Sequence, residues 1–168
     1  MTKKTLQDLF VHELSDIYSA EKQLTKALPK LARAAANPEL ASAFNAHLEE
    51  TQGQVERIDE VVETCDLHLK RVKCAAMEGL VEEGREIIDE IESGPVRDAA
   101  LIAAAQKVEH YEIASYGTLC TFAKQLQLDS ADKLLQATLK EEKGADQKLN
   151  DLALGGLNQK AGQHQAKA

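Results

Sequence analysis

The 168-residue sequence has few residues that interrupt helices, and none of the patterns that favour strands. It contains three prolines, nine glycines and no tryptophan, and no segment shows a run of alternating β-branched residues. These absences argue against a protein built from sheets. Alanine, leucine, glutamate, lysine and glutamine, which favour helices, are abundant instead. The composition therefore predicts an all-α protein, and the length suits one domain with a substantial core.

The sequence also lacks a cysteine framework and long hydrophobic runs. Its cysteines, Cys65, Cys74 and Cys120, are odd in number and have no close metal-ligand spacing, so reduced thiols of a cytosolic protein are expected. Cys65 and Cys74 flank a predicted loop, which leaves open a pairing under oxidation. The N-terminal residues lack the apolar segment of a signal peptide, and no stretch approaches membrane-spanning length. We therefore expect a cytoplasmic protein without a membrane partner.

Positive charge is scarce. The chain has 20 lysines and arginines against 28 aspartates and glutamates, which gives a formal net charge of −8. Its one basic cluster, at residues 70–73, is too short to form a basic face. A nucleic-acid-binding protein would need such a face, so nucleic acid is not expected as a partner.

Hydrophobic periodicity predicts four long helices and one shorter helix. The long helices are expected at about residues 5–36, 38–64, 95–126 and 130–153, and the shorter one at about 74–93. A long connection after the second helix is the wiring of a ferritin-like four-helix bundle, here with a fifth helix in the crossover. Gly155-Gly156 is expected to end the last helix. The predicted organisation is a helical domain over 1–154 and a polar, frayed tail over 155–168.

Each predicted long helix carries at least one acidic residue toward its interior face. The clearest is Glu112, which falls near the middle of the stripe formed by Leu101, Val108 and Leu119. The others are Glu21, Glu50, Glu109 and Glu142. An unpaired carboxylate in a poorly hydrated interior costs several kcal/mol, so a proton, a basic partner or a metal ion must neutralise it.

A dinuclear iron or manganese carboxylate site draws its ligands from four helices in this way. Hard anionic oxygens suit these ions, and the three-residue spacing of Glu109 and Glu112 lets both reach one pair of metals. Taken singly, Glu21 or Glu50 is better explained as an ordinary solvated or hydrogen-bonded helix residue than as a ligand. Tyr116 is interpreted as a packing residue, and Tyr18 as a possible hydrogen-bond partner of a ligand.

Three segments, residues 9–24, 47–51 and 108–117, resemble the YciF family of bacterial stress-response proteins. The resemblance covers nearly the whole chain up to about Leu154. It implies membership of the ferritin-like superfamily, alongside rubrerythrins, ferritins and manganese catalases. It further implies a cytoplasmic homodimer with a role in the stress response, but no settled enzymatic activity.

The superfamily pattern implies metal ligands at the five glutamates named above, and the sequence departs from it in two places. The second helix has His47-x-x-Glu50 instead of E-x-x-H. On the fourth helix the residue three positions after Glu142 is Ala145, not histidine, and Asp146 comes next. Glu109-x-x-Glu112 is similar to rubrerythrin. The complete set of candidate metal ligands is Glu21, His47, Glu50, Glu109, Glu112, Glu142 and Asp146. His47 is equally an ordinary hydrogen-bond donor at the edge of the core.

Three functions are compatible with these residues. The first is a dinuclear-metal oxidoreductase, peroxidase-like, catalase-like or ferroxidase-like, with peroxide or oxygen as the small oxidant. The second is a protein that sequesters iron or manganese without turnover. The third is a metal-free interaction protein of the stress response. We rank the dinuclear-metal oxidoreductase ahead of the other two functions. A homodimer is also favoured by apolar residues beyond one bundle seam, at Leu9, Val11, Leu48 and Val62.

Overall fold

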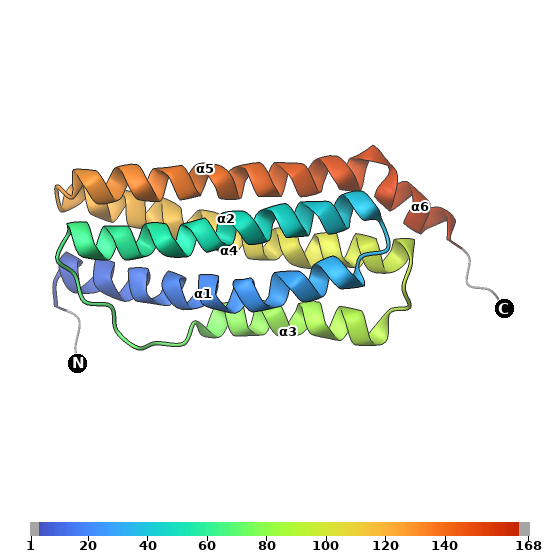
Figure 1. The fold of residues 1–168 in the computed structure, drawn as a ribbon, viewed down its shortest axis with the longest axis horizontal. Coiled ribbons are helices and arrows are strands. Elements are labelled where there is room, and N and C mark those ends of the chain that lie inside the picture. Colours follow the sequence, from blue (N-terminus) through green and yellow to red (C-terminus); the bar gives the residue numbers. More distant parts are fainter. Residues whose placement is uncertain (1–3, 165–168) are drawn as a thin grey trace.

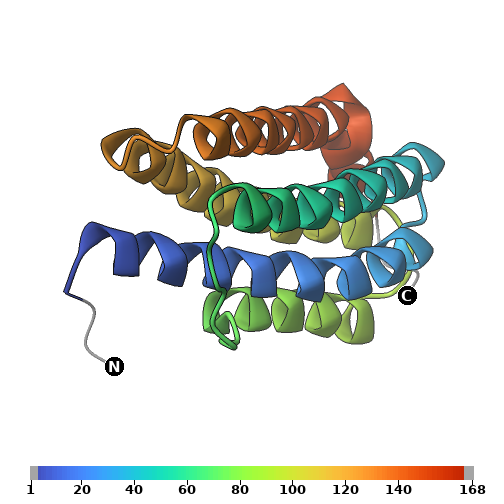
Figure 2. The ribbon, with the colours of Figure 1, turned by 60° about the vertical axis from the view of Figure 1, so that its left-hand side comes forward.

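The computed structural model describes residues 4–164 and contains no strand within them. Its helices are α1 (Leu6–Ala34), α2 (Pro38–Thr64), α3 (Ala75–Glu90), α4 (Pro95–Gln125) and α5 (Asp129–Leu152), followed by a π-helical turn, η1 (Ala153–Leu157), and α6 (Asn158–Gln163). The long helices α1, α2, α4 and α5 run side by side, and α3 lies along α1 and α4 (Figures 1 and 2). The predicted four-helix bundle with a fifth helix in its crossover is confirmed.

The helix starts follow from local hydrogen bonding. Thr5 and Asp8 form a capping box: the Thr5 hydroxyl accepts a bond from the Asp8 amide (3.0 Å), and the Asp8 carboxylate accepts one from the Thr5 amide (3.2 Å). Asn37 caps α2, whose first residue is Pro38. Pro29 lies inside α1 without ending it. These boundaries agree with the sequence prediction.

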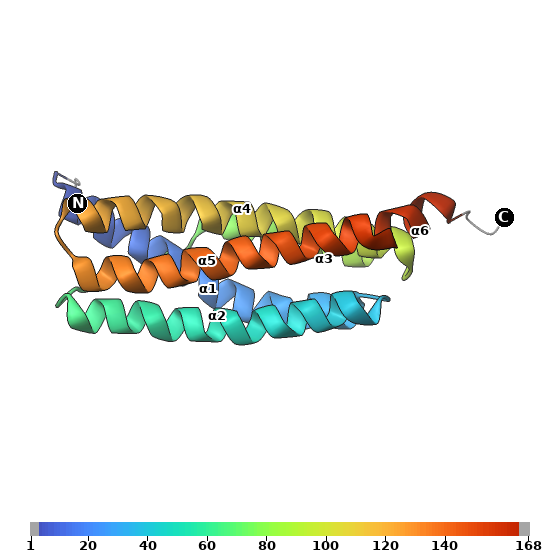
Figure 3. The ribbon, with the colours of Figure 1, turned by 90° about the horizontal axis from the view of Figure 1, so that it is seen from above.

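The four long helices bury one apolar interior. Seen from above, α5 lies between α4 and α2 and packs against both (Figure 3). Fully buried side chains come from all four, among them Phe10, Phe44, Leu101 and Leu135. Helix α3 buries only Met77 and Gly84 completely, so it covers the bundle from outside. No helix within residues 4–164 has the length and apolar character of a membrane span.

Helical structure continues beyond the glycine pair, where the sequence predicted a frayed tail from residue 155. Gly156 turns the chain with a φ of 127°, and α6 then packs against α4. Ala153 and Leu157 are buried in the core, and this burial holds the segment in place. The expectation is corrected for residues 155–164. The remainder of the predicted tail, 165–168, lies outside the described residues, as do 1–3.

An unpredicted contact joins the start of α4 to the turn between α1 and α2. The buried carboxylate of Asp98 accepts hydrogen bonds from the backbone amides of Ala36 (2.8 Å) and Asn37 (2.9 Å). Hydrogen bonds to a charged acceptor contribute more than neutral ones. Asp98 therefore fixes the end of the crossover against the first helix pair.

Replacing Asp98 with alanine is expected to lower the free energy of unfolding by about 2–3 kcal/mol, because two backbone donors lose a charged acceptor. Chemical denaturation of the two proteins measures this loss. Asp98→Asn, which keeps one acceptor oxygen, should lose less. A loss below about 0.5 kcal/mol for the alanine variant would contradict this role for Asp98.

Candidate metal centre

Four buried residues from three helices bring potential metal ligands together in the middle of the bundle. His47 of α2, Glu109 and Glu112 of α4 and Glu142 of α5 each offer one ligand atom, and these atoms all lie within 4.8 Å of one another. Their exposed fractions are 6% for His47, 1% for Glu109 and 0% for the other two. The three-residue spacing on α4 turns Glu109 and Glu112 to the same side. This group could hold a metal ion.

Glu21 supplies the acid of the remaining long helix, α1. It is fully buried, and one of its carboxylate oxygens accepts a hydrogen bond from the Tyr116 hydroxyl. The other oxygen has no partner. Glu21 is close enough to the cluster for its charge to raise the pKa of Glu112, in addition to the larger effect of burial. Inward-facing acids on α1, α4 and α5 thus share one polar interior with His47.

Most ligand atoms of this interior have no hydrogen-bond partner. Buried polar atoms in proteins are nearly always paired, so a concentration of unpaired ones needs an explanation. The unpaired atoms are Oε2 of Glu21, Nε2 of His47, Oε2 of Glu109 and both carboxylate oxygens of Glu112 and of Glu142. Once these groups lose their protons, their lone pairs can bind a cation.

Protons can also neutralise the cluster. Burial raises the pKa of Glu21 to about 8, and it raises the pKa values of Glu112 and Glu142 well above the usual range. Burial acts against a charge on His47, but the charge of Glu109 and the contacts with Glu109 and Glu50 outweigh it and raise the pKa of His47. The folded chain without a cation therefore retains protons at neutral pH.

His47 is the only basic side chain within ion-pair distance of these buried acids in residues 4–164. Its Nε2 lies 3.2 Å from Oε1 of Glu109 and 3.9 Å from Oε2 of Glu142. No lysine or arginine of the described chain pairs with the cluster. One imidazole cannot balance several carboxylates, so the acids are not neutralised by basic partners.

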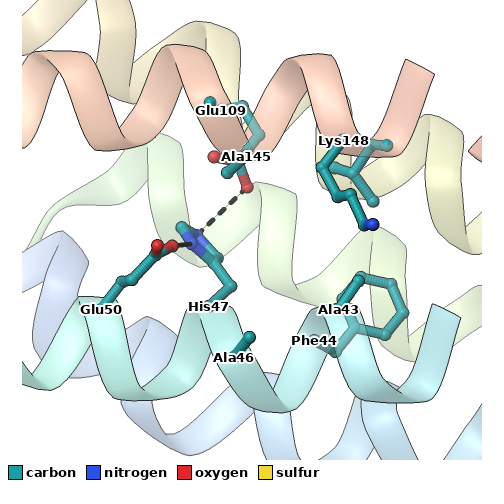
Figure 4. Close-up of a pocket in the computed structure, with 10 residues that line it drawn as sticks. Ala43, Phe44, Ala46, His47, Glu50, Glu109, Ala145 and Lys148 are labelled. Carbon is teal, nitrogen blue, oxygen red and sulfur yellow. Dashed lines mark hydrogen bonds and ion pairs between the residues drawn. The ribbon is translucent and has the colours of Figure 1, made fainter. Parts of the chain in front are cut away.

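Two predicted ligands, Glu50 and Asp146, lie outside the cluster. The Glu50 side chain is 46% exposed, and its Oε2 is 3.4 Å from Nδ1 of His47, on the side of the ring away from Glu109 (Figure 4). Asp146 accepts a hydrogen bond from Gln106 (3.2 Å) and lies 3.3 Å from Nε2 of His110. On α2 it is thus His47, not Glu50, that faces the interior.

Sequence reasoning did not identify Arg57, which joins a polar layer beside the cluster. Arg57 donates to both carboxylate oxygens of Glu141 (2.8 and 2.9 Å) and to the Thr138 hydroxyl (2.6 Å). The fully buried Gln54 donates to Glu141 as well (3.1 Å). Gln54 follows His47 by seven residues, two helical turns, so the two side chains share one side of α2.

Tyr116 was also missed, because it was interpreted as a packing residue. It is fully buried and bonds Glu21, whereas Tyr18, the predicted partner, has Lys22 above its ring at 5.4 Å. Tyr116 follows Glu112 by four residues, which places both on one face of α4. That spacing could have identified it.

The family described as DUF892, a domain of unknown function, matches residues 5–162. The chain belongs to this family. Protein YciF of Escherichia coli (strain K12) is 64% identical over 162 residues, which span 96% of this chain and 98% of that protein. The resemblance found in the sequence is therefore confirmed.

Solved structures of similar proteins share the fold. The crystal structure of the E. coli stress protein YciF matches with a TM-score of 0.91 at 64% identity, and the match covers 94% of this chain and all of that one. YcfI from Rhodopseudomonas palustris matches with a TM-score of 0.84 at 48% identity, over 88% of this chain and 94% of that one. A protein from Xanthomonas campestris, 20% identical with a TM-score of 0.69 over 92% and 99% of the chains, shares the fold alone.

The raised pKa values predict how the metal-free protein responds to pH. Glu21, Glu112 and Glu142 keep protons in the folded state that they lose near pH 4.5 when unfolded. Their contribution to stability is complete below that pH and is lost as the pH rises toward the folded pKa, about 8 for Glu21. The free energy of unfolding should fall by about 1.4 kcal/mol per pH unit for each retained proton.

Denaturant titrations of chelator-treated protein at several pH values between about 5 and 8 measure this slope. Glu21→Gln carries no titrating proton at that position and should show a shallower slope. A stability that is constant or rises over this range would show that the cluster does not retain protons.

Proposed function

We propose that the buried cluster binds two divalent ions of iron or manganese and that the loaded centre reacts with a small oxidant, oxygen or peroxide. The observation that carries this proposal is the set of unpaired ligand atoms on Glu21, His47, Glu109, Glu112 and Glu142. Because these carboxylates are buried, their charges destabilise the folded state unless they are neutralised. No lysine or arginine of the described chain neutralises them.

The charges fit two divalent ions. When Glu21, Glu109, Glu112 and Glu142 are all ionised and His47 is neutral, the interior carries a charge of about −4, which two divalent cations balance. A single divalent ion would leave two carboxylates to be neutralised by protons. The charge count therefore supports a dinuclear site over a mononuclear one.

The chemistry of the donors supports iron or manganese. Carboxylate oxygens suit hard cations, and one imidazole among them is common in iron and manganese sites. Zinc sites usually use more nitrogen or sulfur donors, and no cysteine belongs to this cluster. When bound, such metals supply electron transfer and Lewis-acid activation of an oxygen species.

The surrounding residues hold the ligands in place. Tyr116 donates a hydrogen bond to Glu21 and so fixes the position of that carboxylate. Glu50 lies beside Nδ1 of His47, which leaves Nε2 facing Glu109 and Glu142. The carboxylate and imidazole atoms are thus prepositioned before any ion arrives.

The cellular setting is proposed from the relatives. The E. coli relative is called a stress protein, and we place this chain in the same context, in the cytoplasm, where its free thiols would persist. A homodimer also remains a proposal. Val11, Leu48 and Val62, which suggested it, are half-buried against the core within one chain.

Elemental analysis of protein loaded anaerobically with ferrous or manganous ions tests the metal centre. We expect about two ions per chain. The double variant Glu112→Gln, Glu142→Gln should bind none, because two carboxylates that face the interior become neutral amides. Glu49→Gln, an exposed change on α2 that does not contact the cluster, should still bind its ions. Wild-type protein that binds no metal would overturn the proposed function.

The redox role has its own test with the loaded protein. Ferrous oxidation by oxygen or peroxide should be faster than in an equal concentration of free ions, and the double variant should lose the acceleration. Metal that binds but is not oxidised faster would identify a protein that sequesters metal without turnover.

Replacing Tyr116 with phenylalanine removes the hydrogen bond to Glu21 and keeps the ring. The expected result is a metal affinity lower by about 10- to 100-fold, measured by competition with a chelator, because the carboxylate loses its fixed position. Tyr111→Phe is the matched control on α4, since Tyr111 bonds Asp16 and Cys74 instead. Equal losses in both variants would contradict a specific role for Tyr116.

A further inference from the structure

A cavity of about 250 Å³ lies between α2 and α5, directly beside the cluster. His47 and Glu109 form its inner end, and its walls include Ala43 and Phe44 (Figure 4). Leu149 of α5 also lines it. The exposed side chains of Glu50 and Lys148 also line it. Figure 4 shows Lys148 reaching from α5 toward Ala43 and Phe44 on α2.

The cavity exists because small residues face each other across the two helices. Ala43 and Ala46 on α2 lie across the cavity from Ala145 on α5 (Figure 4), and Gly144 of α5 also lines it. A Cβ atom added at Gly144 would meet no atom within 4 Å, so the space beside it is open. Larger side chains at these positions would close the cavity by packing the helices together.

The inner end of the cavity differs from its walls. Nε2 of His47 and Oε2 of Glu109 are buried there without hydrogen-bond partners. Apolar walls that lead to a few unpaired polar atoms are typical of small-molecule sites. These atoms belong to the proposed metal ligands, so a molecule in the cavity would have one end at the metal centre.

The size and charges of the cavity indicate what it binds. A water molecule takes up about 30 Å³, whereas an apolar cavity of about 150 Å³ accommodates benzene. Oxygen or hydrogen peroxide would leave most of the 250 Å³ unfilled. Glu50 and Lys148 carry opposite charges at the lining, so neither an anion nor a cation is favoured. These features fit a neutral molecule with a hydrocarbon body.

We propose that this cavity binds a small neutral organic molecule, with its hydrocarbon body between α2 and α5 and a single alcohol or hydroperoxide group facing His47 and Glu109. The position of the polar group rests on the proposed function, because it needs a metal ion to bind. The apolar contacts do not, since Ala43, Phe44, Ala145 and Leu149 form the walls without any ion.

Binding of the hydrocarbon body between α2 and α5 is tested first, in metal-free protein. We choose 2-phenyl-2-propanol as the probe, since it combines an aryl body with one unreactive hydroxyl, and follow the alanine methyl groups by NMR. The methyls of Ala43, Ala46 and Ala145 should shift and saturate. Ala145→Leu fills the cavity and should weaken binding at least about tenfold, as should Ala43→Leu from the opposite wall. Ala137→Leu, at an exposed position of α5, should bind like wild type.

The head group is tested by calorimetry on manganese-loaded protein, where the probe should bind at least about threefold more tightly than in metal-free protein. Shifts confined to other methyls, or leucine variants that bind like wild type, would overturn the proposal. Protein that binds manganese but shows no gain in affinity for the probe would contradict the proposed orientation of the head group. Protein that binds the probe at these methyls but takes up no metal would refute the proposed function and leave the cavity's ligand class standing.

Discussion

Mutual repulsion among buried carboxylates is the constraint on which the site depends. Glu21, Glu109, Glu112 and Glu142 sit in an apolar interior with one imidazole as their only basic neighbour in the described chain. Each ionised carboxylate alone would lose favourable hydration there, and the four together repel one another. The bundle tolerates them only with protons or cations bound. Ordinary selection for stability would favour leucine at these positions, so their presence points to a role in binding.

The fold and most of the inward acids were predictable from the sequence because apolar residues recur at helical spacing on α1, α2 and α5, and an apolar stripe runs through Glu112 on α4. Glu112 lies in the middle of an apolar stripe, and only the buried face of α4 can accommodate that position. Glu21 and Glu142 occupy comparable positions on α1 and α5. Four such stripes joined by short turns and one long crossover leave few alternatives to a bundle.

Finer features could not be predicted, because they depend on how each helix is rotated and on contacts distant in sequence. His47 and Glu50 are neighbours on one shoulder of α2, and a small rotation decides which one faces inward. A similar rotation of α5 decides whether Asp146 faces the interior, and in the structure it contacts Gln106 and His110 instead. The order beyond Gly156 rests on the burial of Leu157, which no local pattern reveals. The Asp98 contact joins residues about sixty positions apart.

The inward-facing side chains of the proposed metal centre are spread along the chain from residue 21 to residue 142, so ion binding at this centre would couple ion supply to the amount of folded protein. An unfolded chain holds these side chains far apart, so an ion would bind the native state almost exclusively. By mass action, a free ion concentration of 100 times the dissociation constant would add about 2.7 kcal/mol to the stability of the native state for each ion bound. When the ion is scarce, the native state would lose this stabilisation, and a larger fraction of the chains would be unfolded and open to proteolysis. The cellular level of the protein would then follow metal availability without any dedicated sensor.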